Sequence, residues 1–337
     1  MAHPLRLLLV GPFRRRRVGG VKTHVERLRA QAVALGIQVR TIDPKKWGAL
    51  LFPVWAATSD VVHLHSSNGQ LVRAMTLMAR ALRARVIATV HANLVDLSTR
   101  DQQGFLAAAR GGAELLVLNQ SSADFLVHHD VPFSRVTAFL PPSNAEREAK
   151  RADTTRLQAM LRRVSADFDA VFITYVYDAN YQHSDIYGID DLLDFFGENP
   201  RWALIVLCGC NAGVLSARAR LPNVMIFEGD VTVIEVGHLS NGLLRNSRTD
   251  GDSLFVQEGL YCGARVIATN VVSRPHGVEL YPFGDHMRLA AALRRVIAEP
   301  RPSLSSTDRF DPMDLYCPTP VDDDAPCRRL DMPSASG

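Results

Sequence analysis

Short apolar segments alternate with helical patterns along most of this chain, and that alternation is what most constrains its fold. Five segments of the first half have the length and composition of buried strands: residues 5–11, 60–66, 85–91, 114–119 and 136–142. After the first comes a helical pattern whose apolar residues share one face: Val21, Val25, Leu28, Ala32 and Leu35. Gly36 is placed to end this helix. Near-continuous apolar strands separated by helices are typical of a parallel sheet covered on both faces.

The same alternation restarts after a polar, charged stretch at residues 141–169. Its strand-like and helical segments are 170–178, 189–198, 202–209, 224–230, 254–263, 265–270 and 286–299. We therefore predict an α/β protein with two Rossmann-like parallel-sheet domains facing across a cleft, where ligands bind beyond the carboxyl ends of the strands. The predicted divisions are a first domain at 1–145, a linker at 146–168, a second domain at 169–300 and an irregular tail at 301–337. Within the tail, only FDPMDLY (310–316) offers groups that could dock.

Composition excludes several classes of protein. With 337 residues, 47% of them hydrophobic and 22% charged, the chain reads as globular rather than disordered. Its net charge of +3 gives no argument for nucleic acid as a partner. No apolar run approaches the roughly 20 residues that span a bilayer, and the apolar stretch near the N-terminus is too short for a signal peptide. Five cysteines, an odd number, favour reduced thiols and a cytoplasmic location over a disulfide framework.

The segment RNSRTDGDSLFVQEGLYCGARVIAT (245–269) combines a loop, a helix and an apolar strand. The helix is expected to start at Asp252 or Ser253, since both are good N-caps, and its first amides would favour an anion. Asp250 lies in the loop, and Glu258 lies about 9 Å up the helix axis at about 1.5 Å per residue. A nucleotide sugar, with a diphosphate between two hydroxyl-bearing rings, fits this layout.

Capping gives a second interpretation of the same segment. Asp250 and Asp252 could serve only as helix caps, and Glu258 could form a surface ion pair with Arg265. The wider sequence favours the ligand-binding interpretation, because other motifs accompany the segment.

Six segments carry these motifs in order: VGPFRRRRVGGVKTHVERL (10–28), DVVHLHS (60–66), ATVHANL (88–94), YGIDDLLDFF (187–196), FEGDV (227–231) and LLRNSRTDGDSLFVQEGLYCGARVIATNV (243–271). Together they resemble retaining glycosyltransferases of the GT4 type, closest in look to bacterial polysaccharide and lipopolysaccharide enzymes. The resemblance extends along most of residues 5–300. It implies a GT-B fold, in which the second domain holds the donor and the first holds the acceptor.

The resemblance also implies roles for individual residues. Glu258 would bind the ribose hydroxyls, Asp250 the hydroxyls of the transferred sugar, and His91 the sugar near the reacting carbon. The other implied donor-binding residues are Gly19, Gly20, Arg245, Arg248, Gly251, Asp252, Ser253 and Leu254. The family transfers sugar with retention and usually needs no metal, so no cofactor is expected beyond the nucleotide-sugar donor.

Four positions depart from the family pattern. An Arg and a Lys that commonly contact the diphosphate are missing, and Tyr187 stands where the Lys would be. Leaving-group stabilisation would then depend on helix amides and on Arg245, Arg248 or Arg274. Asn246 replaces a Pro, and Gly259 replaces an Ala inside the helix, at a cost of up to about 1 kcal/mol. These departures leave open an alternative function, a catalytically weakened relative that binds nucleotide sugar or glycan, or acts as a scaffold.

Histidines and arginines raise further hypotheses. His63 and His65 alternate on one strand, but no third ligand is evident, so we predict no metal site. The run Arg14, Arg15, Arg16 and Arg17 and the nearby His24 would lie on the acceptor side. There the run could hold an anionic glycan or lipid-linked acceptor, rest on an anionic membrane surface as a peripheral contact, or simply be solvated. A dinucleotide-dependent enzyme is disfavoured because the first loop lacks Gly-x-Gly-x-x-Gly.

Overall fold

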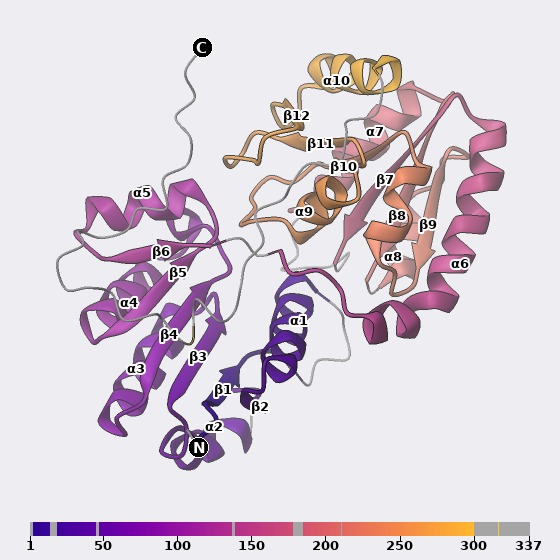
Figure 1. Cartoon of the computed structure of the whole chain (residues 1–337). Coiled ribbons are helices and arrows are strands. Elements are labelled where there is room, and N and C mark those ends of the chain that lie inside the picture. Colours follow the sequence, from indigo (N-terminus) through magenta and orange to yellow (C-terminus); the bar gives the residue numbers. More distant parts are fainter. Residues whose placement is uncertain are drawn as a thin grey trace.

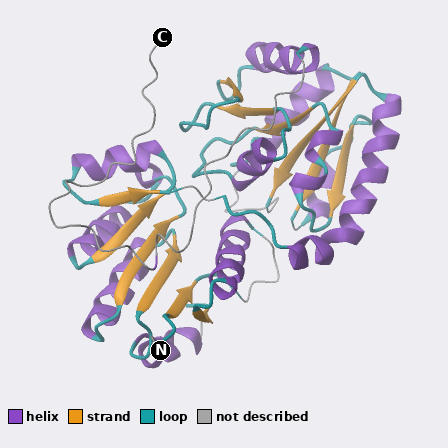
Figure 2. Ribbon diagram, in the orientation of Figure 1, coloured by secondary structure: helices purple, strands orange, loops and turns teal. Residues whose placement is uncertain are grey.

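The computed structural model describes residues 3–13, 19–44, 47–136, 139–177, 185–209 and 211–299, together with Tyr316. It contains two six-stranded sheets, and every strand pairing in both is parallel. Helices flank the strands in each half (Figure 1 and Figure 2). The predicted α/β architecture with two parallel sheets is confirmed.

The first sheet has the order β2-β1-β3-β4-β5-β6. Its strands are β1 (Arg6–Val10), β2 (Gln38–Ile42), β3 (Val61–Ser66), β4 (Arg85–Val90), β5 (Ala113–Val117) and β6 (Phe133–Arg135). Its helices are α1 (Gly20–Ala34), α2 (Trp47–Ala56), α3 (Gly69–Ala81), α4 (Thr99–Arg110) and α5 (Gln120–His128), with a short 3₁₀ turn η1 (Leu94–Asp96). The strand predicted at 136–142 is wrong: β6 ends before it, and the described residues there are irregular.

Alternation along the strands builds a core on each face of this sheet. In β1, Leu8 and Val10 face the cluster that α2 to α5 complete, whereas Leu7 and Leu9 face the cluster that α1 completes. Tyr316 also belongs to the second cluster and is buried there. A residue of the FDPMDLY motif therefore packs on the first sheet.

The second sheet has the order β12-β11-β10-β7-β8-β9. Its strands are β7 (Ala170–Val176), β8 (Trp202–Cys208), β9 (Val224–Glu228), β10 (Gly242–Arg245), β11 (Val266–Thr269) and β12 (Val278–Tyr281). One face is covered by α7 (Ile189–Glu198), α8 (Ala212–Arg218) and α10 (His286–Ala298). The other is covered by α6 (Asn144–Asp167), α9 (Leu254–Tyr261) and the 3₁₀ turns η3 (Val233–Glu235) and η4 (Gly237–Leu239).

The stretch predicted as a linker is the long helix α6. It starts after Ser143, whose side chain accepts a hydrogen bond from the amide of Glu146. Its buried residues Leu157, Leu161 and Val164 pack on the second sheet. The connection between the halves is thus also a layer of the second half, seen along its outer edge in Figure 1.

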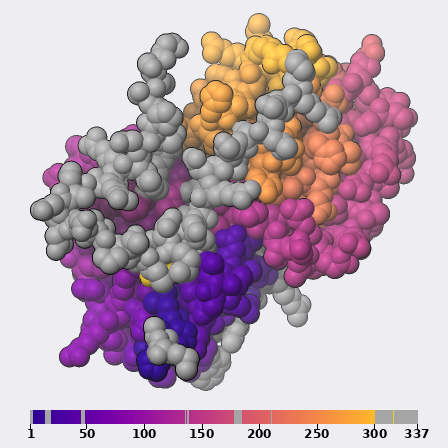
Figure 3. Space-filling view, in the orientation of Figure 1, coloured from indigo at the N-terminus to yellow at the C-terminus, as the bar shows by residue number. Residues whose placement is uncertain are grey.

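The two halves touch each other. Helix α1 of the first half contacts α9 of the second, and the indigo surface of the first half meets the pink and orange surface of the second (Figure 3). None of the helices among the described residues is long and apolar enough to cross a membrane. Of the cysteines, the structure describes Cys208, which is buried, and Cys262, which is partly buried.

Candidate functional site

The predicted loop–helix junction is present between β10 and α9. Helix α9 begins at Leu254, and Ser253 is its N-cap, as expected. The Ser253 side chain makes no capping hydrogen bond, and the Asp252 carboxylate accepts from the side chain of Gln257 instead. The explanation of Asp250 and Asp252 as helix caps is therefore not supported.

Asp250 lies in a buried ion-pair cluster with two arginines. One carboxylate oxygen is 3.0 Å from Nε of Arg245 and 2.9 Å from NH1 of Arg274. The other oxygen accepts from NH2 of Arg245 at 3.1 Å. Burial acts to raise the pKa of Asp250, but the two guanidinium groups outweigh it and hold this pKa well below its usual value.

Glu258 faces the first half of the molecule. Its Oε1 is 2.5 Å from NH2 of Arg27, which comes from α1, and both side chains are buried. Arg27 also makes two hydrogen bonds to Glu146, of 2.9 and 2.8 Å. The surface pair with Arg265 is wrong, because Arg265 donates to the carbonyl of Glu299. Burial is the main cause that raises the pKa of Glu258, while Arg27 acts to lower it.

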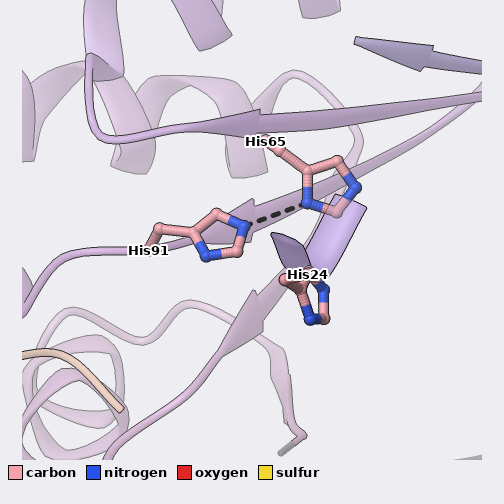
Figure 4. A group of neighbouring side chains, drawn as sticks. All are labelled: His24, His65 and His91. Atoms are coloured by element: carbon pink, nitrogen blue, oxygen red, sulfur yellow. Dashed lines mark hydrogen bonds between the residues drawn. The ribbon is translucent and has the colours of Figure 1, made fainter. Parts of the chain in front are cut away.

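Three histidines meet where the first sheet approaches the second half (Figure 4). His24 comes from α1, His65 from β3, and His91 follows β4. Nδ1 of His65 lies 3.0 Å from Nε2 of His91, and the ring centroids of His24 and His91 are 5.2 Å apart. Burial is the main cause that lowers the pKa of both His65 and His91 well below its ordinary value, so these rings are neutral at neutral pH.

The same three rings are the group among the described residues that could hold a metal ion. One nitrogen atom of each lies within 4.8 Å of the others. No third ligand for the pair His63 and His65 was evident from the sequence; in the fold, helix α1 and the end of β4 bring His24 and His91 to His65 instead. Tetrahedral zinc needs nitrogen atoms about 3.3 Å apart, at a Zn–N distance of about 2.0–2.1 Å. The His65–His91 hydrogen bond indicates a hydrogen-bonded pair instead, and the buried Nε2 of His65 lacks, among the described residues, the outer partner that a metal-ligating histidine usually has.

His63 has a separate, structural role. Its ring nitrogens lie 2.8 Å from the hydroxyls of Tyr316 and Thr89. Both ring nitrogens are thus satisfied inside the core, as a buried histidine requires.

Glycines show how closely the halves approach. A Cβ added at Gly251 would lie 2.9 Å from the carbonyl oxygen of His91, and one at Gly19 would lie 2.9 Å from the ring of Tyr177. A Cβ at Gly20 would have no atom of the described residues within 4 Å. The Thr249 hydroxyl donates to Asp96 of the first half at 2.5 Å. The loop between β10 and α9, which carries Asp250, therefore packs closely on the residues that follow β4.

The departures from the family pattern have structural partners. Asn246 donates to the carbonyl of Gly188 and to Asp191, and its oxygen accepts from the hydroxyl of Tyr281. A Cβ at Gly259 would come within 2.6 Å of Leu243, so the absence of a side chain permits α9 to pack closely on β10. The Gly in the helix thus has a packing reason that offsets its propensity cost.

The candidate diphosphate ligands are not equally placed. Arg245 is bound to Asp250 and lies 5.2 Å over the ring of Tyr187. Arg248 is exposed, donates to the carbonyl of Asp185 and lies 4.4 Å over the ring of Phe283. Arg274 is buried beside Asp250. The run Arg14–Arg17 lies outside the described residues.

Two site residues escaped the sequence analysis. Arg27 lies on α1 next to its apolar face, and a buried charge at such a position needs a partner that the local sequence does not supply. Glu146 stands three residues after Ser143, a spacing that predicts a capping box rather than a cross-domain ion pair.

Comparison with known proteins defines the fold. The Anabaena protein HepE, solved in complex with UDP-glucose, matches with a TM-score of 0.65 at 13% identity over 87% of this chain and 90% of that one. The chain has the GT-B fold. WaaG, a glycosyltransferase involved in lipopolysaccharide biosynthesis, matches this GT-B chain with a TM-score of 0.57 at 15% identity, covering 88% and 90%.

The GT-B fold also occurs outside the transferases. UDP-GlcNAc 2-epimerase from Methanocaldococcus jannaschii matches with a TM-score of 0.53 at 12% identity, covering 89% of this chain and 94% of that one. No family model and no curated protein matches the chain. Since one fold hosts different reactions, function has to be argued from the site.

Proposed function

We propose that this protein is a glycosyltransferase that moves a sugar from a nucleotide-sugar donor to a glycan or lipid-linked acceptor, with retention and without a metal. The observation that carries the proposal is that the segment with Asp250 and Glu258 meets the first half of the GT-B fold at two places. Gly251, next to Asp250, lies against the backbone of His91, and Glu258 pairs with Arg27. The complexes of HepE with UDP-glucose support a nucleotide sugar as the donor class.

The donor would lie along α9. The first amides of α9, which Ser253 leaves uncapped by its side chain, suit the diphosphate. Glu258 would accept hydrogen bonds from the ribose hydroxyls, and the space beside Gly20, clear of atoms of the described residues, leaves room for phosphate oxygens. The neutral ring of His91 can donate to or accept from a sugar hydroxyl.

The cluster around Asp250 offers a substitute for the missing Arg/Lys pair. One carboxylate and the two guanidinium groups of Arg245 and Arg274 sum to a single positive charge. Such a fixed charge in a buried site stabilises the negative charge that grows on a leaving diphosphate. In this arrangement Asp250 also orients both arginines, besides binding the transferred sugar.

The acceptor would approach from the first half. His24 and the loop that contains Arg14–Arg17 belong to this side, and a cationic loop suits an anionic lipid-linked acceptor at the cytoplasmic face of a membrane. The alternative function is a GT-B relative with weakened catalysis that binds nucleotide sugar or glycan, or acts as a scaffold. The strong pairing of Asp250 favours this alternative, because it competes with sugar binding.

A calorimetric panel of UDP, GDP, ADP and their common sugars, run in EDTA, tests the donor site. We expect one nucleotide to bind the wild type, and Glu258→Gln to weaken it by about 10- to 100-fold through loss of a charge-assisted hydrogen bond. Glu279→Gln, which removes a surface ion pair of β12, is the matched control and should bind as the wild type does.

Turnover then separates the two functions. Conversion of the bound nucleotide sugar in EDTA supports the transferase, and tight binding without turnover supports the scaffold. Absence of binding to every nucleotide by the folded wild type contradicts both.

A further inference from the structure

Five charged side chains form a largely buried network between the halves. Its members are Arg27, Glu146, Lys150, Asp230 and Glu258. Arg27 contributes from α1, Glu146 and Lys150 from α6, and Glu258 from α9. Lys150 lies 3.1 Å from Glu146 and 3.0 Å from Asp230. We call this set the interdomain charge network.

The guanidinium of Arg27 is held on three sides. Nε and NH2 donate to the two oxygens of Glu146, and NH1 donates to the carbonyl of Leu140 at 2.9 Å. NH2 also reaches Oε1 of Glu258 at 2.5 Å. With its side chain only 2% exposed, this arginine cannot turn without leaving buried donors unpaired.

Glu258 is bound through one oxygen. Arg27 takes Oε1, and within the described ranges no hydrogen bond reaches Oε2. A carboxylate oxygen has two lone pairs, so Oε2 can accept from a ligand while Oε1 keeps its arginine. The contact fixes the direction of the carboxylate and leaves Oε2 unused by the described residues.

We propose that Arg27 is a positioning residue for nucleotide recognition: it orients Glu258 so that Oε2 accepts the ribose hydroxyls. This inference rests on the proposed function, and it adds that the first half completes the donor site of the second. Because Arg27 and Glu258 come from opposite halves, the carboxylate has its binding geometry only while the halves are in contact.

A double-mutant cycle on nucleotide affinity tests this role. The variants are Arg27→Gln, Glu258→Gln and the double variant, with Arg29→Gln on the exposed side of α1 as the matched control. Each single change is expected to weaken binding by about 10- to 100-fold. The double variant should bind no more weakly than Glu258→Gln alone, because Arg27 acts only through Glu258.

The pH dependence of nucleotide affinity gives a second test, because a purely structural role of Arg27 would not change it. The groups facing Glu258 are Arg27 on α1, Glu146 and Lys150 on α6, and Cys262 at the end of its own helix. Without Arg27 the buried carboxyl holds its proton to a higher pH, so the affinity of Arg27→Gln should improve as the pH rises. The wild type should show less of this dependence, and Glu258→Gln none.

Arg27→Lys and Glu146→Gln keep the test decisive if Arg27→Gln does not fold. Lysine keeps the charge but lacks the planar fork, so intermediate affinity is expected. Loss of the Glu146 anchor should weaken binding without a change at Glu258 itself. Tighter nucleotide binding in any of these variants, or a loss that adds fully to that of Glu258→Gln, overturns the proposal. Failure of the wild type to bind nucleotide refutes the proposed function instead.

Discussion

Asp250 lies in a loop, yet it forms the centre of a buried cluster with two arginines. The sequence places it correctly beside a helix start, because an N-cap and its spacing to Glu258 are local features. Its two arginine partners are a different matter. Arg245 is near in sequence, but Arg274 arrives through the turn after β11, which no local pattern specifies.

Replacement of Asp250 by Asn should lower the stability of the protein, because the carboxylate is buried between two arginines. The change leaves two buried guanidinium groups without a counter-charge, so we expect a loss of about 3–5 kcal/mol in the free energy of unfolding. Urea denaturation of D250N and the wild type at pH 7 measures it. A loss below about 1 kcal/mol would contradict a buried cluster.

The pH dependence of stability follows from the same pair. The pKa of Asp250 is depressed in the folded state, so its contribution is present above the unfolded pKa of about 4 and is lost as the pH falls further. The wild type should therefore lose stability on acidification below pH ~4 more steeply than D250N.

The partner of Glu258 could not be predicted at the residue scale. Arg27 lies 231 residues away, so only the tertiary fold brings the two together. Sequence spacing pointed to Arg265, seven residues along, and the fold turned that side chain toward the end of α10.

At the scale of elements, the long buried strands were predictable, whereas the edge strands β2 and β12 were not. β1, β3, β4, β7 and β8 are buried along most of their length and are rich in apolar residues, because both of their faces are covered. β2 and β12 lie at sheet edges, and in both the burial is partial, so neither shows an apolar run. β10 has only four residues and begins at Gly242. Short or polar strands of this kind form because a neighbour supplies their hydrogen bonds.

Helices α3 and α4 illustrate an element contact that depends on glycine. A Cβ added at Gly104 would lie 2.3 Å from the carbonyl carbon of Gly69, and one at Gly69 would lie 1.9 Å from the carbonyl oxygen of Asp101. The two helix backbones thus touch directly, so an added side chain could be accommodated only by moving the backbone.

Gly104→Ala should therefore destabilise the protein despite the better helix propensity of alanine. Overpacking at a backbone contact is expected to cost about 3 kcal/mol, measured by urea unfolding. Gly197→Ala in α7 is the matched control, since its Cβ would meet only ordinary contacts at 3.7 Å. Equal stabilities of the two variants would show that α3 and α4 can separate freely.

At the scale of the whole molecule, the two halves touch through the loop between β10 and α9, which carries Thr249, Asp250 and Gly251. Two contacts link this loop to the residues after β4: Thr249 with Asp96, and Gly251 with His91. The sequence predicted two halves and a cleft between them, but the surfaces that meet came only with the tertiary structure.

Gly251→Ala should affect turnover more than stability. The new methyl group would lie 2.9 Å from the carbonyl oxygen of His91, so the closed arrangement becomes strained while each half keeps its own core. We expect kcat/KM to fall by about 10-fold, equivalent to about 1.4 kcal/mol, with a change in unfolding free energy below about 1 kcal/mol. Unchanged kcat/KM would show that catalysis does not use this contact.

The burial of Tyr316 has a consequence for how the protein is made. Its hydroxyl contacts His63, which leaves the ribosome 253 residues earlier. At about 5–20 residues per second, that interval lasts on the order of 10 to 50 s. During that interval, the apolar surface formed by Leu7, Leu9 and Leu116 lacks the ring of Tyr316 that later packs with it. The N-terminal core therefore begins to form early in translation and gains Tyr316 only after the second half has been synthesised.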